Sequence, residues 1–310
     1  MKKKIMLAVD NSRPSKNAIR YAVQMSSNVN NLHFVLFHAQ PGISLFLLEE
    51  AQKSGKAKMQ LDRVLNKNDV AARKLLDNYK NEMVEMGVNS DRIECITKKR
   101  NLGFAKDILE FGLEGQYDAI VVGRRGLSRL AELYAGSVTT NIIEQSQLIP
   151  IWLVDGEVKT GGVLLAIDGS EASMRAVDHV SFILSHNPDA HLTLLHITGN
   201  AQQYSEIDFD EEPNPELEEI IAHAETACIT QFYPQAIKRF EDAGISEDRV
   251  KLEIIKGGRR IGKAILDFAQ KGKYSTVVVG RKGIDKAFFM GSASRYVINK
   301  ISNGALWIVP

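Results

Sequence analysis

The stretch "VVGRRGLSRLAELYAGSVTTNII", residues 121–143, decides the fold, because in it a buried strand runs into a glycine turn and then into a helix. Gly123 ends the strand, and a Gly-Ser pair (136–137) opens the helix. Near the C-terminus, "VVGRKGIDKAFFMGSASRYVIN" (278–299) repeats the pattern with a shorter gap before its Gly-Ser pair. The chain therefore carries one strand–loop–helix unit twice.

Repetition extends over nearly the whole sequence at an offset of 155 to 158 residues, which is typical of a duplicated domain rather than of a short tandem array. The paired segments are 5–12 with 163–170, 32–39 with 191–197, 91–96 with 248–254, 117–126 with 274–283, and 149–154 with 304–309. The polar, glycine-rich stretch "DGEVKTGG" between the copies suits a linker. We predict two domains, 1–154 and 162–310.

Each copy alternates short apolar, β-branched runs with longer amphipathic stretches. Continuous apolar strands indicate a parallel sheet that is covered on both faces. The fold class is therefore α/β, with two doubly wound, five-stranded parallel-sheet domains. In the first copy we expect strands near 4–9, 32–38, 92–97, 118–122 and 149–154, and helices over 15–25, before Gly87, over 104–113 and from Ser137. In the second copy a helix starts near Pro215.

The fifth strand of each copy ends its domain and carries a tryptophan, Trp152 or Trp307. An apolar edge strand without a cover would be prone to association. We expect the two fifth strands to pair with each other inside one chain, which would relate the domains by a pseudo-twofold axis.

Composition argues for a reduced, charge-balanced protein. The formal net charge is +1 and the chain has two cysteines, Cys95 and Cys228, neither beside ligand-like neighbours. No apolar run approaches the roughly twenty residues of a membrane-spanning helix. We predict a cytoplasmic protein that has neither nucleic acid nor a membrane as its partner.

Two unusual strand ends meet at the expected ligand site. In an open parallel sheet, ligands bind at the carboxyl ends of the strands where the winding reverses, here between strand one and strand four. Asp10 follows strand one and Gly123 ends strand four. Glycine lets backbone amides approach a phosphate, and a helix start favours an anion. Three or four hydrogen bonds to a charged phosphate, at about 1.5–3 kcal/mol each, could support binding of such a ligand with roughly micromolar affinity.

The pattern Gly-two-Gly-nine-Gly-Ser, with "AVDNS" and "AIDGS" after the first strands, resembles the nucleotide-binding subgroup of the universal stress protein family. The resemblance covers nearly the whole chain and implies a tandem member with an adenine-nucleotide alpha-hydrolase-like fold. It implies that the ligand is ATP, or ADP or AMP, with or without Mg²⁺. It also implies dimerisation through the fifth strand, so a homodimer is an alternative to pairing within the chain. The implied site residues in copy one are Ala8, Val9, Asp10, Ala39, Gly123, Gly126, Gly136, Ser137 and Val138, and Arg125 is a further candidate because of its charge.

Copy two departs from the family pattern, because only seven residues separate Gly283 from Gly291. Removing two residues shortens an extended loop by up to ~7 Å. Copy two either binds nucleotide, or the phenylalanines of its "AFFM" segment fill the crevice or make an interface. Its candidate ligand residues are Asp168, Gly280, Gly283, Gly291 and Ser292.

Several other residues keep two interpretations. Arg124 and Arg125 either neutralise phosphate or belong to a solvated turn. His38 and His196 stand at equivalent strand ends, but no paired spacing typical of a metal site accompanies them. The apolar segment within 42–59 covers either the nucleotide site or a partner surface.

Three functions compete. The first is a stress protein whose ATP occupancy alters its shape or partners, with hydrolysis slow at most. The second is a scaffold without ligand, acting through protein interfaces. The third is a nucleotidyl-transfer enzyme, which is disfavoured because the His-x-Gly-His motif of such enzymes is replaced by "DNSRPS" and "DGSEAS".

Overall fold

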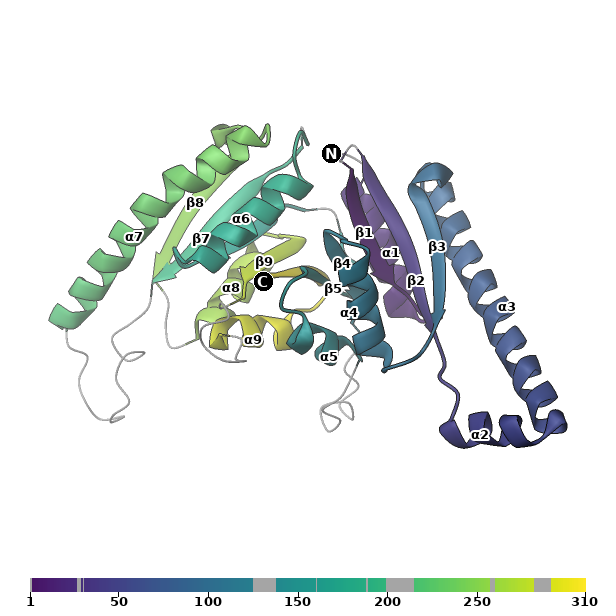
Figure 1. The fold of residues 1–310 in the computed structure, drawn as a ribbon. Helices are drawn as coiled ribbons and strands as arrows, with labels where there is room; N and C mark the ends of the chain where they lie inside the picture. Colours follow the sequence, from purple (N-terminus) through teal and green to yellow (C-terminus); the bar gives the residue numbers. More distant parts are fainter. Residues whose placement is uncertain are drawn as a thin grey trace. The chain divides into compact units, whose positions relative to one another are not determined.

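The chain folds into two compact units that divide between Gly156 and Glu157, and we name them domain 1 and domain 2. The structure is a computed structural model (Figure 1). It describes the chain except for residue 1 and residues 27–28, 30, 125–137, 160, 188, 199–214, 257–259 and 282–290.

Domain 1 is built from five strands and five helices among its described residues. The strands are β1 (Lys3–Ala8), β2 (Leu32–Gln40), β3 (Ile93–Lys99), β4 (Ala119–Gly123) and β5 (Ile151–Asp155). The helices are α1 (Arg13–Ser26), α2 (Leu45–Lys53), α3 (Gly55–Glu85), α4 (Phe104–Glu114) and α5 (Val138–Gln145), and a 3₁₀ turn (Ser90–Arg92) precedes β3. The strand order is β3-β2-β1-β4-β5, and the neighbouring strands are parallel.

Domain 2 repeats this order of elements without a counterpart of α2 in its described residues. Its strands are β6 (Val163–Ile167), β7 (Leu192–Thr198), β8 (Val250–Lys256), β9 (Thr276–Gly280) and β10 (Gly304–Val309). Its helices are α6 (Glu171–Ile183), α7 (Pro215–Asp242), α8 (Ile261–Lys271) and α9 (Ser292–Lys300), with a 3₁₀ turn at Glu247–Arg249. The parallel order is β10-β9-β6-β7-β8.

The helices form the outer layers that a doubly wound fold requires. In domain 1, α1 packs beside α3 and α4 packs beside α5, while α6 with α7 and α8 with α9 repeat these pairs in domain 2 (Figure 1). The central strands are consequently buried on both faces, and Leu7 and Leu165 have no exposed surface. This confirms the predicted α/β class and its parallel sheets.

The strand register brings the predicted crevice together. Ala8 of β1 lies beside Val122 of β4, so the residues that follow them, Val9 and Gly123, lie at one edge of the sheet. In domain 2, Ala166 of β6 lies beside Val279 of β9 in the same way. The winding reverses at β1 and at β6, as the strand pattern predicts.

The tryptophan of each fifth strand is fully buried and meets the first helix of its own domain edge-on. Trp152 contacts Tyr21 with ring centroids 6.3 Å apart, and Trp307 contacts His179 at 5.5 Å. The same position on α1 and α6 therefore anchors the same strand in both domains, with a different aromatic ring.

Candidate functional site

A cleft of about 930 Å³ opens at the carboxyl ends of β6, β7 and β9 in domain 2. This volume lies within the range of small-molecule and cofactor sites. Four residues predicted for copy two line the cleft: Asp168, Gly280, Gly291 and Ser292. Gly283 lies outside the described residues. The cleft also has residues that the sequence analysis did not single out, namely Ser170, Ser173, Glu225, Cys228, Arg260 and Tyr296.

The loop after β6 holds Asp168 by serine hydroxyls. Ser173 Oγ donates to Asp168 Oδ1 at 2.7 Å, and Ser170 Oγ donates to the same oxygen. In return, the Asp168 backbone N–H donates to Ser173 Oγ at 3.0 Å. Partial desolvation raises the pKa of Asp168, but the hydrogen bonds from Ser170 and Ser173 outweigh it and lower the pKa below its usual value. The carboxylate is therefore a fixed, ionised hydrogen-bond acceptor.

Domain 1 builds the same loop around Asp10. Ser15 Oγ donates to Asp10 Oδ1 at 2.7 Å, Ser12 Oγ donates to the same oxygen, and the Asp10 N–H donates to Ser15 Oγ at 2.9 Å. The sequence analysis named the aspartates and missed their serines. The signal was present, because Asp-x-Ser-x-x-Ser occurs after the first strand in both copies.

The glycine at the end of the fourth strand is required by close packing. A Cβ on Gly280 would lie 2.6 Å from the carbonyl oxygen of Ala172, and a Cβ on Gly123 would lie 2.3 Å from that of Pro14. The start of the first helix thus presses against the end of the fourth strand in both domains. This contact explains both glycines without a ligand.

A second contact joins the same glycine to the following helix. Ser294 Oγ donates to the Gly280 carbonyl at 3.3 Å, and Thr139 Oγ1 donates to the Gly123 carbonyl at 3.5 Å. Because the two contacts correspond, the shorter loop of copy two does not displace the start of α9. Ser292 opens α9 at the cleft, where free N–H groups and the helix dipole favour an anion.

The remaining predicted residues of domain 1 divide into two groups. Val9 donates its N–H to Phe37 O at 2.9 Å and accepts from His38 Nδ1 at 2.8 Å, so it connects β1 with β2. Ala8 ends β1, Ala39 is buried in β2, and Val138 begins α5. The other predictions, Arg125, Gly126, Gly136 and Ser137, lie outside the described residues.

Arg124, which kept two interpretations, is anchored by its backbone. Its N–H donates to Val154 O at 2.8 Å, and Arg281 donates to Val309 O at 2.7 Å in domain 2. Burial lowers the pKa of the Arg124 guanidinium, and the nearby Asp155 carboxylate works against this shift. The main chain after each fourth strand therefore extends the pairing with the fifth strand.

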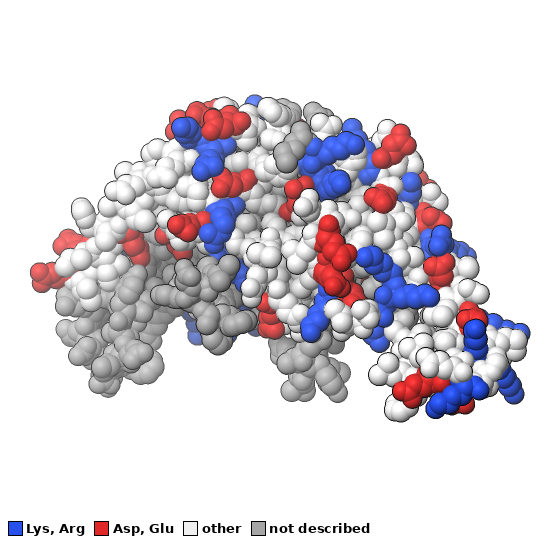
Figure 2. Space-filling view, viewed as in Figure 1, with Lys and Arg blue, Asp and Glu red and all other residues white. Residues whose placement is uncertain are grey.

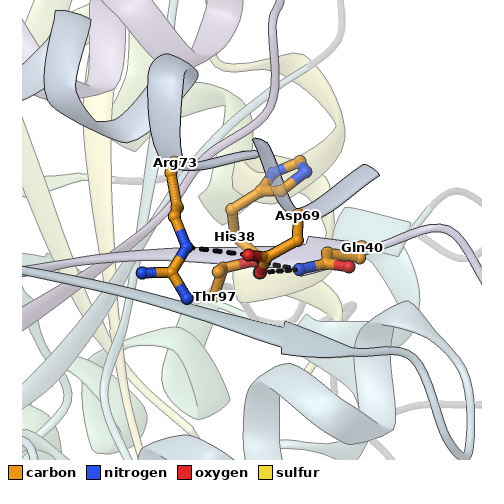
Figure 3. A network of polar contacts seen from close by, with 5 residues as sticks. All are labelled: His38, Gln40, Asp69, Arg73 and Thr97. Atoms are coloured by element: carbon orange, nitrogen blue, oxygen red, sulfur yellow. Dashed lines mark hydrogen bonds and ion pairs between the residues drawn. The ribbon is translucent and has the colours of Figure 1, made fainter. Parts of the chain in front are cut away.

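A polar network lies at the end of β2 in domain 1 (Figure 3). Gln40 Nε2 donates to Asp69 Oδ1 at 3.2 Å and to Thr97 Oγ1 at 3.1 Å. Arg73 Nε forms an ion pair with Asp69 Oδ2 at 2.8 Å. The carboxylate of Asp69 on α3 is thus engaged both by Gln40 of β2 and by Arg73 of its own helix.

A second cavity, of about 440 Å³, lies at the amino ends of the domain 1 strands. Lys2, Lys4, Lys80 and Arg92 line it together with Asp91 and Glu94. Its charges are mixed, and Figure 2 likewise shows the two signs of charge interspersed on the visible face of the described residues. The fold rule for open sheets favours the carboxyl ends as the ligand site instead.

In the described part of the chain, no three His, Cys, Asp or Glu side chains gather as metal ligands would. The helices described here are also too short or too polar for any of them to cross a bilayer.

Comparison with known proteins identifies the family. The sequence model of the universal stress protein family matches residues 1–155 and again 161–309. A universal stress protein from Mycolicibacterium smegmatis is 24% identical over 198 residues, which are 62% of this chain and 63% of that relative, slightly less than two thirds of its length.

Solved structures show the same fold over the full chain. A universal stress protein from Archaeoglobus fulgidus is similar over 99% of this chain and 97% of its own, with a TM-score of 0.66 and 18% identity. One from Pseudomonas aeruginosa, described as a putative universal stress protein, covers 99% and 93% with a TM-score of 0.62 and 14% identity. Two matches to 49% of this chain, with TM-scores of 0.33 and 0.34, were solved with cAMP and with dAMP, which are ligands of those proteins. Since both halves match the family separately, the chain belongs to the universal stress protein family, with two such domains in tandem.

Proposed function

We propose that this chain binds adenine nucleotides, ATP foremost, at the carboxyl edge of each domain and acts in the stress response through nucleotide occupancy. The observation that carries the proposal is the cleft of about 930 Å³ in domain 2, where Asp168 and the start of α9 face one space. Cleft and helix start together suit a ligand with a sugar and a phosphate chain.

Each wall of the cleft has a chemical part in this proposal. The N–H groups at Gly291 and Ser292 bind the phosphates, and Arg260 adds a positive charge from the start of α8. Asp168 Oδ1 is engaged by Ser170 and Ser173, so Oδ2 is the oxygen that accepts from a ribose hydroxyl. A Mg²⁺ ion would be held chiefly by the phosphates, as is usual for nucleotide sites.

The proposal assigns a regulatory or protective role rather than a dedicated enzyme. A general base works best when its pKa lies near neutrality, and the pKa of Asp168 is shifted away from that value. Asp168 is therefore suited to binding rather than to activating water, and hydrolysis, if any, is slow.

In domain 1 we propose the corresponding site at Ala8, Val9, Asp10, Ala39, Gly123, Arg125, Gly126, Gly136, Ser137 and Val138. The matching Asp10 loop and the matching contact of Thr139 support it. Residues 1–154 and 162–310 stay our proposed domain bounds, and the cytoplasm stays the proposed location.

Nucleotide content and calorimetry test the proposal. The chain, purified without added nucleotide and then denatured, is expected to release adenine nucleotide, and the emptied chain is expected to bind one ATP in each domain. Ser292→Asp places a carboxylate where the phosphates lie, so it abolishes binding in domain 2 while favouring the α9 helix dipole.

Ser292→Asn is the matched control, because it adds similar bulk without charge and is expected to weaken binding far less. Nucleotide-free protein combined with flat calorimetry would refute the proposal. ATP binding in domain 2 that Ser292→Asp leaves unchanged would refute the phosphate assignment.

One observation favours the scaffold function as second candidate. On α2, the side chains of Leu45 and Phe46 are 74% and 84% exposed. Such side chains are typical of a contact surface. A chain that binds no nucleotide in the test above would leave this surface as the principal functional feature.

A further inference from the structure

The starts of two helices border the domain 2 cleft. The first turn of α9 lines the cleft from Ser292 onward, and the first turn of α8 lines it at Ile261 and Gly262. The two turns pack directly on each other, because a Cβ on Gly262 would lie 2.7 Å from the carbonyl oxygen of Ala293. The missing side chain at Gly262 therefore allows both helix starts to line one space.

The start of α8 is electropositive. Its first turn contains no acidic residue, and no side chain caps it. In the described part of the chain, the backbone N–H groups of Ile261 and Gly262 have no hydrogen-bond acceptor. The N-cap residue, Arg260, is exposed and lines the cleft beside them. Open N–H groups, the positive end of the helix dipole and a guanidinium together favour a negatively charged ligand.

The corresponding helix start in domain 1 already holds an anion. Asp107, the fourth residue of α4, is buried and accepts from the backbone N–H groups of Asn101 and Leu102 at 2.9 and 2.8 Å. The fourth residue of α8 is Ala264. Domain 1 thus supplies a carboxylate from its own chain at this place, and domain 2 has a methyl group instead.

We propose that Arg260 and the start of α8 form a second phosphate-binding element in the domain 2 cleft and make this domain selective for nucleoside triphosphates. The inference rests on the proposed nucleotide site, in which the start of α9 already binds phosphate. A triphosphate has a separate phosphate group for each helix start, whereas a monophosphate has one group for both. In domain 1 the carboxylate of Asp107 would repel a phosphate at the start of α4, so this selectivity belongs to domain 2.

Cys228 allows the domain 2 cleft to be observed separately in the full chain. Its exposed thiol lines the cleft, so a bound nucleotide is expected to shield it from an alkylating reagent. Cys95, the other cysteine, is half-buried in β3 of domain 1. Peptide mass spectrometry separates the two thiols, and an unchanged rate at Cys95 reports that the fold is unchanged.

The first experiment measures the alkylation rate of Cys228 at increasing concentrations of ATP or of AMP. In the unchanged protein, ATP is expected to protect at about tenfold lower concentrations than AMP, which is the effect of one additional hydrogen bond to a charged group. Arg260→Gln removes the guanidinium, so this preference is expected to fall to about one. Lys263→Gln is the matched control, because it removes a positive charge that pairs with Asp267 instead of lining the cleft, and it is expected to keep the preference.

A second variant copies the domain 1 arrangement into domain 2. Ala264 is half-buried, and Ala264→Asp places a carboxylate at the start of α8 as Asp107 does in α4. The preference for ATP is expected to be lost, while an acid in the first turn favours the helix and keeps α8 folded. Ala264→Asn has the same shape without the charge and is expected to retain the preference.

The outcomes separate this inference from the proposed function. Equal protection by ATP and AMP in the unchanged protein would overturn the triphosphate selectivity and leave nucleotide binding standing. A preference that survives Arg260→Gln or Ala264→Asp, or that Lys263→Gln removes equally, would overturn the assignment to the start of α8. Absence of protection by either nucleotide would overturn both this inference and the proposed site in domain 2.

Discussion

Serine hydroxyls hold the aspartates that face the proposed sites. In each domain, the Oδ1 atom of one aspartate, Asp10 or Asp168, accepts hydrogen bonds from two serine hydroxyls. The two loops have the same length and the same sequence pattern. A carboxylate held in this way is preorganised, so less side-chain entropy is lost when a ligand binds. Sequence alone identifies the aspartates because they follow apolar strands. It identifies the serines only through the repeat.

At the residue scale, Tyr79 of α3 supports the main chain at Asp10. Its hydroxyl donates to the Asp10 carbonyl at 2.8 Å, and burial, followed by the charges of Asp10 and Glu82, raises its pKa to about 12. Folding therefore favours the protonated phenol. The stabilisation is complete below pH 10, the usual pKa of tyrosine, and is lost as the pH rises toward 12.

We expect Tyr79→Phe to lower the free energy of unfolding of domain 1 by about 1 kcal/mol at neutral pH, through loss of one hydrogen bond. Between pH 10 and 12 the difference should disappear or reverse, because a shift of two pKa units corresponds to about 3 kcal/mol. Urea unfolding followed by tryptophan fluorescence, at a series of pH values, measures the difference in unfolding free energy between the two proteins. A difference that is constant over this range would contradict the expectation.

At the scale of elements, the start of α4 depends on one carboxylate. Asp107 is buried and accepts from the backbone N–H groups of Asn101 and Leu102 at 2.9 and 2.8 Å. Gly103, between that loop and the helix, has a φ of +128°, which an L residue rarely adopts. The loop and the first turn therefore form one unit around Asp107.

Asp107→Ala is expected to destabilise domain 1 by about 1.5–3 kcal/mol, because the backbone N–H groups of Asn101 and Leu102 lose their charged acceptor. Hydrogen exchange of the 100–108 peptide should accelerate, with no change in domain 2. Glu110→Ala removes the same charge from an exposed position of the same helix, so it serves as control. Equal effects of the two substitutions would show that charge alone, and not the loop contacts, matters.

The positions of the elements show how well the periodicity of the sequence predicts secondary structure. Strand positions, the long helix before Gly87 and the helix start at Pro215 agree with the expectations to within a few residues. The segment 42–59 had two interpretations, a cover for the nucleotide site or a partner surface, and the sequence does not choose between them. It forms α2 and the first turn of α3, with Leu45 and Phe46 directed to solvent.

At the scale of the whole molecule, the fifth strands contrast with the outer ones. In β5 and β10 nearly every residue is buried, whereas β3 and β8 expose several side chains. An outer strand that is polar is protected from association, and an apolar one requires a partner. Pairing of 149–154 with 304–309 within the chain stays our prediction.

We expect residues 1–156 and 157–310, coexpressed as separate chains with one tag, to purify together in equal amounts. The apolar fifth strands would associate because each covers the other. Size-exclusion chromatography with light scattering measures the complex. Halves that elute apart, or that pair only with themselves, would contradict pairing within the chain and favour a homodimer.

The sequence by itself determined the duplication, the α/β class and the edge at which the ends of β1 and β4 lie side by side, because these follow from local periodicity and from the repeat. Only the tertiary structure decided that α9 starts at the cleft despite a shorter loop, and that Glu225 faces His196 while Asp69 faces Gln40 and Arg73. The physical reason is that such contacts join residues far apart in the chain. A single helical position changes which neighbours a side chain meets, and no local pattern records that change.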